Sequence, residues 1–256
     1  MKARHLFRAA SGFIQFIGVV LVAFIDYPFF CAFHGKEPKP MVRAQWLQRH
    51  CRRALKIFNA TISVSGSIPA SGLLVSNHLS YLDILVISSI SPAVFVAKRE
   101  VKSWPVVGWL TQMAGSIFVN REQKTQVAEI NEKIETAFNS GVLIVLFPEG
   151  TSSDGSTLLP FKSALLEPAA QQAHCLTAGF LEYTLDDGDA ASEICYWGDH
   201  TFFPHLLNLL GLRGFRIVMR LAPFEPANTD RKELARLLRA EILRLKEDCA
   251  SSTFCR

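Results

Sequence analysis

The sequence lacks several patterns that would assign it to a common functional class. Its six cysteines include no Cys-x-x-Cys pair, so we interpret them as reduced residues in a cytosolic setting, mostly small core hydrophobes. There is no Gly-x-Ser-x-Gly motif, and the nearest approach, residues 150–155, has the wrong spacing for a serine hydrolase. No internal repeat or low-complexity segment is present, so the chain is not a repeat array.

Charged residues are missing from one stretch and unbalanced around it. Residues 9–25 carry no charge, and the apolar character continues to Phe33. Residues 1–60 hold ten Lys and Arg against two acidic residues, a balance of +8, whereas the rest of the chain carries −4. Because this basic excess accompanies an apolar run and no recognisable nucleic-acid-binding fold, it indicates a membrane surface rather than nucleic acid.

Two helices are expected in this N-terminal segment. The run 9–25 is at the short limit for crossing a hydrocarbon core of ~30 Å, and no small-residue exit follows it, which argues against a cleaved signal peptide. Residues 41–58 have the pattern of a basic interfacial helix, with an apolar stripe of Leu47, Cys51, Ala54, Leu55 and Phe58. Basic residues on both sides of the apolar run favour a helical hairpin that dips into the membrane with both ends cytosolic. The alternative is a helix pair packed on the domain that follows.

Residues 61–256 are expected to form one α/β domain, a mixed, mainly parallel sheet flanked by helices, preceded by the membrane-associated helical hairpin of residues 1–60. The hydrophobic content of 49% over 256 residues allows a sizeable core. Strands are predicted at 61–65, 72–76, 93–97, 115–119, 142–147, 174–184, 193–197 and 214–221. Helices are predicted at 80–90, 123–139, 163–172 and 230–248, with a short helical region at 99–113 and a long loop at 148–162.

A histidine stands five residues before an aspartate at the end of a predicted strand. His78 follows the apolar run 72–76, and Asp83 falls in the first turn of the next helix. Asn77 or Ser80 can cap that helix. Residues i and i+5 do not share a helix face, but across a turn into a helix the aspartate can fold back onto the imidazole. It would then fix the ring tautomer and leave the other nitrogen as a general base near neutral pH.

Two further predicted strands end in polar groups. Arg121 follows the strand at 115–119, and the strand at 142–147 runs into Pro148-Glu149-Gly150-Thr151. Because carboxyl ends of parallel strands meet at one sheet edge, where ligand crevices form, we expect these groups to lie near His78. The planar guanidinium of Arg121 suits a phosphate or carboxylate. Glu149 and the backbone at Gly150 can bind hydroxyls, and Thr151 can cap a turn.

Three segments resemble the first three motif blocks of the glycerolipid acyltransferase family, whose best-known members are the 1-acylglycerol-3-phosphate acyltransferases. They are Asn77-His78 with Asp83, Gly115 to Arg121, and Phe147 to Thr151, and the resemblance extends over roughly residues 60–185. It implies transfer of an acyl chain from acyl-coenzyme A or acyl carrier protein to the free hydroxyl of a lysolipid. It also implies no covalent enzyme intermediate, no cofactor and no metal.

The resemblance further implies roles for single residues. His78 is the base and Asp83 its orienting partner, while the acceptor is bound by Asn77, Arg121, Glu149, Gly150 and Thr151. The chain departs from the family pattern at Ser152, where many members have Arg, and at Ala178, where a fourth block usually has Pro. The first choice of acceptor is 1-acylglycerol-3-phosphate. Residues 147–155, 159–162, 196–199 and 203–205 look closer to bacterial members that acylate lyso-ornithine lipid, which is the alternative acceptor.

Two other classes stay open. A thioesterase would use His78 to activate water, against which Arg121 and Glu149 argue, and a silent lipid-binding membrane protein would not need the intact His/Asp pair. The expected partners are membrane lipids as acceptors and acyl-coenzyme A or acyl carrier protein as donor, at the cytoplasmic face of the inner membrane. Residues 186–189 resemble a metal loop in composition only, and we interpret them as a turn.

Overall fold

A seven-stranded sheet organises the chain. The computed structural model describes residues 3–35, 37–119, 127–167, 170, 175–225 and 230–251. The strand order is β1-β7-β6-β2-β5-β3-β4, and every neighbouring pair is parallel except β6 with β7. The strands are β1 Ala60–Ser65, β2 Gly72–Ser76, β3 Ala93–Lys98, β4 Ile117–Val119, β5 Leu143–Leu146, β6 Leu176–Thr184 and β7 Phe215–Phe224. The mixed, mainly parallel sheet predicted from the sequence is confirmed.

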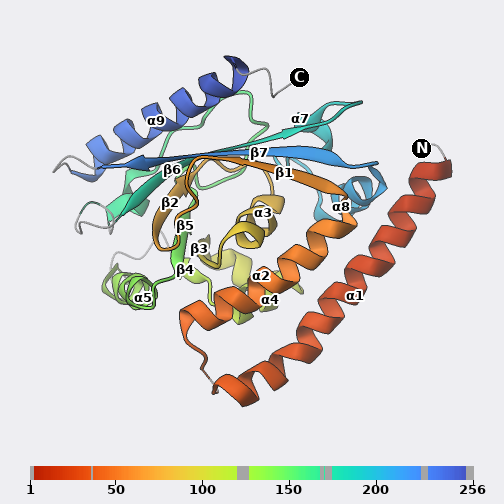
Figure 1. Cartoon of the computed structure of the whole chain (residues 1–256), viewed down its shortest axis with the longest axis horizontal. Helices are drawn as coiled ribbons and strands as arrows, with labels where there is room; N and C mark the ends of the chain where they lie inside the picture. The colour runs from red at the N-terminus through yellow and green to blue at the C-terminus, as the bar shows by residue number, and fades with distance from the viewer. Residues whose placement is uncertain are drawn as a thin grey trace.

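Helices cover both faces of the sheet (Figure 1). One face packs against α2, α3 and α8, and the other against α5 and α9, each with its own apolar core. The helices are α1 Ala3–His34, α2 Pro40–Ile57, α3 Leu82–Ile90, α4 Val107–Met113, α5 Val127–Asn139, α7 Ala190–Glu193, α8 Phe202–Gly211 and α9 Arg231–Ser251. Two 3₁₀ helices, η1 Arg99–Ser103 and η3 Ser163–Leu166, complete the described elements.

The central strands are apolar on both sides because both sheet faces are covered. All residues of β2 and β5 are buried, which explains why each reads as an uninterrupted apolar run. The outermost strand β1 alternates half-buried and exposed residues, since only one of its faces meets the core. The apolar runs that predicted β2 and β5 were therefore a reliable signal.

Two predicted elements differ from the structure. Residues 193–197 were predicted as a strand, but the short helix α7 ends at Glu193 and the chain then crosses the carboxyl edge of the sheet, where the amide of Tyr196 donates to the carbonyl of Leu79 at 2.8 Å. This apolar run covers the edge of the sheet and does not pair with another strand. The helix predicted at 163–172 begins as the 3₁₀ helix η3, and part of its remainder lies outside the described residues.

Helix α2 packs its apolar stripe on the domain. Its predicted apolar stripe exists, but Cys51, Ala54, Leu55 and Phe58 are buried, and Leu55 and Phe58 join the main core. The basic residues Arg49, Arg52, Arg53 and Lys56 are exposed on the other side. The prediction that the apolar stripe of α2 lies in a membrane interface is therefore wrong, because this stripe covers α3 and the sheet instead.

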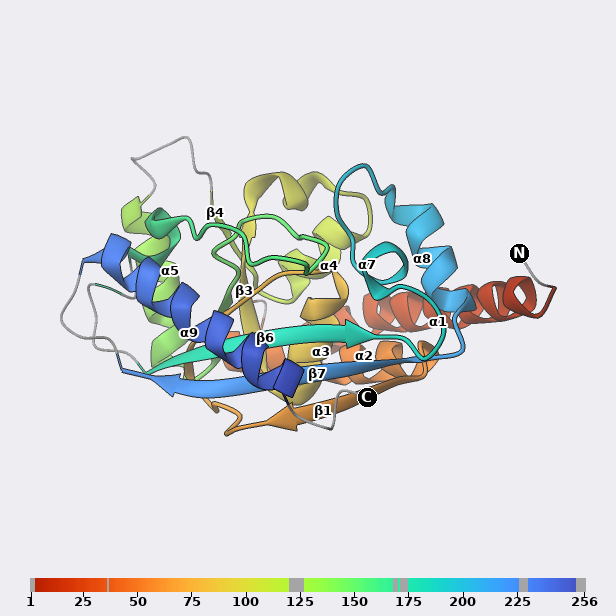
Figure 2. The ribbon, with the colours of Figure 1, turned by 90° about the horizontal axis from the view of Figure 1, so that it is seen from above.

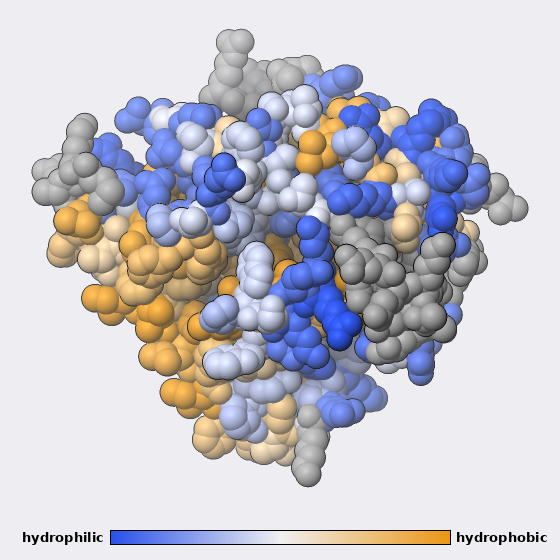
Figure 3. All heavy atoms as spheres, turned by 180° about the vertical axis from the view of Figure 1, so that it is seen from behind, coloured by the Kyte–Doolittle hydropathy of each residue, from blue (hydrophilic) through white to orange (hydrophobic). Residues whose placement is uncertain are grey.

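Helix α1 packs on the domain along one side and leaves the other side open. Ring contacts join it to α8, α2 and α4 through the pairs Phe13–Phe203, Phe16–Phe58, Tyr27–Trp46 and Phe24–Trp109. Its outer side exposes large apolar side chains, namely Leu6, Phe7, Ile14, Ile17, Leu21, Val22, Ile25, Phe29 and Phe33. Figure 3 shows apolar side chains gathered along this flank. By length and composition α1 could cross a membrane, and its exposed apolar face is consistent with membrane association.

Candidate active site

His78 and Asp83 meet as the sequence predicts. The Nδ1 atom of His78 lies 2.7 Å from Oδ2 of Asp83, and the aspartate is fully buried while the imidazole is 21% exposed. The chain turns between β2 and α3, which lets the first helical turn fold back onto the ring. Because the carboxylate accepts, Nδ1 carries the proton, and Nε2 is the nitrogen that can take one from a substrate.

Four donors converge on the Asp83 carboxylate. Besides the imidazole, Oδ2 accepts from the amides of Leu79 at 2.7 Å and Ser80 at 3.1 Å, and Oδ1 accepts from the hydroxyl of Tyr183 at 2.6 Å. Burial and the adjacent Asp83 charge raise the pKa of Tyr183 well above its usual value, so this hydroxyl stays a donor. A buried carboxylate that accepts from four donors is fixed in position, and it orients the base.

The Asp83 contacts replace the cap predicted for this helix. Tyr81 occupies the N-cap position of α3 and makes no side-chain cap, so neither Asn77 nor Ser80 has the expected role. Asp83 itself ties down the amides that precede the helix. The carbonyl of His78 accepts from the amide of Ser153 at 3.0 Å. The turn that carries the histidine is thus fixed from both sides.

The imidazole is also clamped by a ring. Phe147, at the end of β5, stacks on His78 with centroids 4.2 Å apart and planes 13° from parallel. Phe95 on β3 stacks in turn on Phe147 with centroids 6.3 Å apart. These contacts, with the Asp83 bond, restrict the ring to one orientation, which is what a base needs to meet a hydroxyl repeatedly in the same geometry.

Glu149 supports the histidine through the backbone. In the parallel register Val75 pairs with Leu146, so His78 and Glu149 each lie three residues past this pair. Oε1 of Glu149 accepts from the amide of His78 at 2.9 Å, and Oε2 accepts from the amide of Leu159 at 2.9 Å. Burial raises the pKa of Glu149, while both amide bonds act in the opposite direction. Glu149, which the sequence analysis assigned to the acceptor, is therefore buried and bonded through both carboxylate oxygens to backbone amides. It positions the turn that carries His78.

Asn77 has a similar structural position. Its Nδ2 donates to the carbonyl of Leu181 at 2.9 Å, and its Oδ1 accepts from the amide of Leu181 at 2.7 Å. The side chain is buried and continues the pairing of β2 with β6 past the end of β2. These two bonds engage both ends of the side-chain amide, so Asn77 positions the backbone beside His78, and its predicted contact with the acceptor stays a prediction.

The remaining predicted site residues are placed differently from one another. Gly150 is buried and has φ +70°, a conformation that favours glycine, in the turn after β5. Thr151 is exposed beside it. Arg121 lies outside the described residues. Within the described ranges, no group of three or more His, Cys, Asp or Glu side chains is placed to hold a metal ion.

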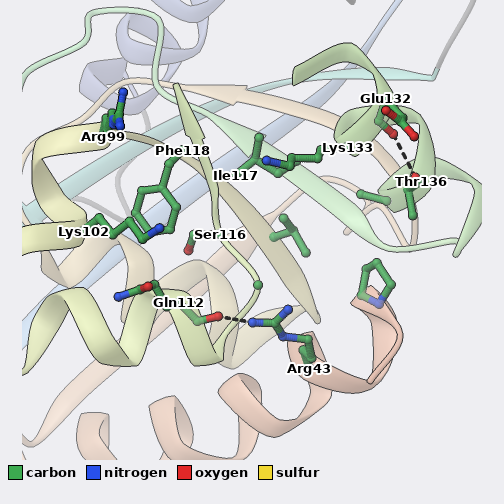
Figure 4. A pocket seen from close by; sticks show the side chains of 14 residues that line it. Arg43, Arg99, Lys102, Gln112, Ser116, Ile117, Phe118, Glu132, Lys133 and Thr136 are labelled. Atoms are coloured by element: carbon green, nitrogen blue, oxygen red, sulfur yellow. Dashed lines mark hydrogen bonds between the residues drawn. The ribbon is translucent and has the colours of Figure 1, made fainter. Parts of the chain in front are cut away.

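A cavity of about 670 Å³ opens beside the edge strand β4. Figure 4 shows Arg99 and Lys102 on one wall and Lys133 on the opposite wall, with Glu132 as the acidic member of its lining. Arg43 at its floor donates to the carbonyls of Gln112 and Met113. The cationic walls suit an anionic group. Since η1 follows β3, two strands from β2, the Arg99 end of the cavity lies roughly 10 Å from the carboxyl end of β2.

Tyr183 and Phe147 are the functional residues that sequence reasoning did not assign. Tyr183 is a hundred residues from Asp83, and only the long strand β6 brings it over the start of α3. Phe147 was identified as part of a motif block, but its stacking on His78 depends on the pairing of β2 with β5. A polar hydroxyl at the end of an apolar strand was the one local signal for Tyr183.

The fold and this site define an acyltransferase. The acyltransferase family model matches residues 59–179, which include His78, Asp83, Phe147 and Glu149. Together with the relatives below, this match shows that the chain belongs to the acyltransferase family.

Several individual proteins are similar to this chain. Lyso-ornithine lipid O-acyltransferase from Rhizobium meliloti is 35% identical over 80% of this chain and 76% of its own length. The enzyme of that name from Pseudomonas aeruginosa is 33% identical over 75% of this chain and 72% of its own. A 1-acyl-sn-glycerol-3-phosphate acyltransferase from Neisseria meningitidis is 37% identical over 50% of each chain. The crystal structure of 1-acyl-sn-glycerophosphate acyltransferase from Thermotoga maritima shares the fold, with a TM-score of 0.67, 18% identity and coverage of 96% and 98%.

Proposed function

We propose that the protein is a lysolipid O-acyltransferase in which His78 is the general base. The observation that carries this proposal is the imidazole fixed by Asp83 and Phe147 at the carboxyl edge of the sheet, partly exposed, with Nε2 left to accept a proton. Asn77 and Glu149 hold the backbone around it and act as positioning residues.

The reaction follows from this arrangement. A lipid hydroxyl is too weak an acid to attack a thioester at neutral pH, so His78 Nε2 removes its proton as the oxygen approaches the carbonyl carbon. The new ester C–O bond forms, the C–S bond breaks, and the proton on the imidazolium neutralises the departing thiolate. The Asp83 carboxylate stabilises the imidazolium between these two steps. The donor is acyl-coenzyme A or acyl carrier protein, and no other cofactor takes part.

We propose lyso-ornithine lipid as the acceptor, ahead of 1-acylglycerol-3-phosphate. The sequence analysis ranked these two acceptors the other way. The relatives named for lyso-ornithine lipid align over 80% and 75% of this chain, whereas the Neisseria relative named for 1-acylglycerol-3-phosphate aligns over 50%. Because the lyso-ornithine lipid relatives align over more of this chain, they support the proposal that this chain shares their acceptor.

The test is a direct comparison of acceptors. Purified full-length protein in detergent is given one labelled acyl donor with lyso-ornithine lipid, with 1-acylglycerol-3-phosphate, and with no acceptor. We expect rapid ester formation on lyso-ornithine lipid and slow transfer to the phosphate acceptor. The reverse order would restore 1-acylglycerol-3-phosphate. Release of free fatty acid at the same rate with and without acceptor would identify a thioesterase instead.

The cavity beside β4 supports an anionic contact on one substrate. Arg99 and Lys102 line one of its walls, and we propose that Arg121, which follows β4 in the chain, contributes to binding of the acceptor. Both donors carry phosphate groups, so the two substrates must be separated experimentally. Arg99→Ala and Arg121→Ala should raise the apparent KM for one substrate more than for the other. If both variants have wild-type kinetics, the cavity has no role in substrate binding.

We propose that the reaction takes place at the cytoplasmic face of the inner membrane, with membrane lipids as acceptors. The exposed apolar side of α1 and the exposed basic residues of α2 support attachment to an anionic leaflet. Protease added to intact cells should leave the chain uncut, whereas protease added to inverted membrane vesicles should cut it. Cleavage in intact cells would place the domain on the other face.

A further inference from the structure

The segment from η1 to α4 presents three large apolar side chains to solvent. Trp104, Val106 and Trp109 are 44%, 41% and 62% exposed. They lie outside the N-terminal helices to which the sequence analysis gave membrane attachment. Figure 2 shows this segment projecting from the sheet on the same side as the connection between α7 and α8, which covers the carboxyl edge near His78.

The backbone of this segment has an unusual conformation next to the exposed side chains. Val106 has φ +64° and ψ −58°, and the amide of Val107 donates to the carbonyl of Pro105 at 2.6 Å, which together form the strained γ-turn that β-branched residues rarely adopt. Gly108 lets the chain pass close to η1, because an added Cβ would lie 2.3 Å from the carbonyl oxygen of Lys102. Backbone strain of this kind persists only where the surroundings enforce it, and it gathers at functional segments.

The exposed side chains continue the apolar flank of α1. The rings of Phe24 and Trp109 meet with centroids 6.0 Å apart, so α4 extends the surface that α1 exposes. Arg99 and Lys102 are exposed at the start of the same segment. Tryptophan beside a cation is the composition that settles at the headgroup level of a bilayer.

We propose that Trp104, Val106 and Trp109 form a second membrane contact, which inserts into the headgroup region of an anionic leaflet beside α1. The domain then rests on the bilayer at two places, and its orientation is fixed. Because the contact lies on the side of the sheet that carries His78, the site faces the lipid surface that supplies its acceptor. The membrane contact does not depend on which lysolipid is acylated, so it can fail while the proposed reaction stands.

The test uses one substitution and a matched control. Val106→Asp places a carboxylate in the contact. Ile68→Asp makes the same kind of change at a residue that is 47% exposed in the connection before β2, at the far end of that strand from His78. Full-length variants are floated with vesicles of phosphatidylcholine and phosphatidylglycerol, and their thermal unfolding and activity in detergent are measured in parallel.

We expect Val106→Asp to bind vesicles roughly tenfold more weakly, the change that corresponds to losing about 55 Å² of apolar burial. Ile68→Asp should bind like wild type, and both variants should unfold and react in detergent like wild type. Trp104→Ser, at a residue that is 44% exposed, should weaken binding in the same direction. Brominated acyl chains should quench less tryptophan fluorescence in that variant. Equal flotation of Val106→Asp, Ile68→Asp and wild type would overturn the proposal.

Discussion

At the scale of single residues, the Asp83 carboxylate links catalysis to the fold. Its Oδ2 accepts from the imidazole of His78 and from two backbone amides, and its Oδ1 accepts from the hydroxyl of Tyr183, so both oxygens are engaged. The same group therefore orients the base and closes the turn between β2 and α3. Substitutions at Asp83 and Tyr183 separate these two contributions.

Asp83→Asn should leave the fold in place and depress turnover. An asparagine can present its oxygen to the imidazole and the amides and its NH₂ to Tyr183, whose hydroxyl can accept. What is lost is the charge that holds the imidazolium, and we expect kcat to fall by about 10²- to 10⁴-fold. The measurement is steady-state acyl transfer beside thermal unfolding. Wild-type turnover in a folded Asp83→Asn protein would remove the aspartate from the mechanism.

Tyr183→Phe tests the positioning role of the tyrosine. It leaves one buried carboxylate lone pair unpaired, at a cost of about 1–3 kcal/mol in the free energy of unfolding. A carboxylate that loses a donor also holds the imidazolium more tightly, so the acid limb of the kcat/KM pH profile should move to higher pH. A merely structural tyrosine would lower stability without moving that limb.

Tyr81→Phe is the matched control for this experiment. Tyr81 is partly buried, and its hydroxyl lies 3.0 Å from Nδ1 of His205 rather than at Asp83. Burial and the neighbouring His200 lower the pKa of His205 to about 4, so this ring is neutral around pH 7. The control variant should lose some stability and keep the wild-type pH profile. The same shift of the acid limb in both variants would show that the effect does not pass through Asp83.

At the scale of elements, the packing of α2 shows that the N-terminal segment cannot be removed without exposing the core of the domain. Its buried side carries Leu55 and Phe58 into the core that also contains α3 and β7. Removing residues 1–60 would therefore strip a core surface along with the exposed helix α1. Attachment and folding have to be tested by single substitutions.

Phe58→Ala should destabilise the domain. Phe58 is 2% exposed and contacts the rings of Phe16 and Phe215, so the cavity left behind should cost about 3–5 kcal/mol in the free energy of unfolding. Arg53→Ala, on the exposed side of α2, should change little. Denaturant unfolding in detergent measures both. An unchanged Phe58→Ala protein that floats poorly with vesicles would instead return α2 to the lipid surface.

The elements that the sequence predicted well are those with a local cause. The runs at β2 and β5 are apolar throughout because both sheet faces are covered, and the His78–Asp83 bond needs only one turn of chain. The stripe on α2 was also visible, but periodicity states which side is apolar and not what covers it. The strand predicted at residues 193–197 was wrong for a related reason. A short apolar run can form a strand, but it can equally cover the edge of a sheet.

At the scale of the whole molecule, the sheet order assembles the site from distant segments. The neighbours β2 and β5 bring Glu149 under His78, and β6 on the other side brings Leu181 to Asn77 and Tyr183 to Asp83. The sequence placed the motif blocks at one edge because parallel strands share it. The register, and with it the roles of Asn77, Glu149 and Tyr183, could be read only from the paired strands.

The same arrangement explains why the base can be removed without losing the fold. The side chain of His78 is partly exposed, and Asp83 keeps three donors when the imidazole is gone. His78→Ala therefore leaves no buried charge unpaired, and loss of activity in this variant would report on chemistry rather than on unfolding.

The most direct test of the account is the rate of acyl transfer from a labelled thioester donor to lyso-ornithine lipid by purified wild type and His78→Ala in detergent. Thermal unfolding of both proteins is recorded in the same buffer. We expect transfer by His78→Ala to fall to the background without enzyme, while its unfolding temperature stays near that of wild type. Turnover by folded His78→Ala at the wild-type rate would contradict the assignment of His78 as the base, and with it the proposed mechanism.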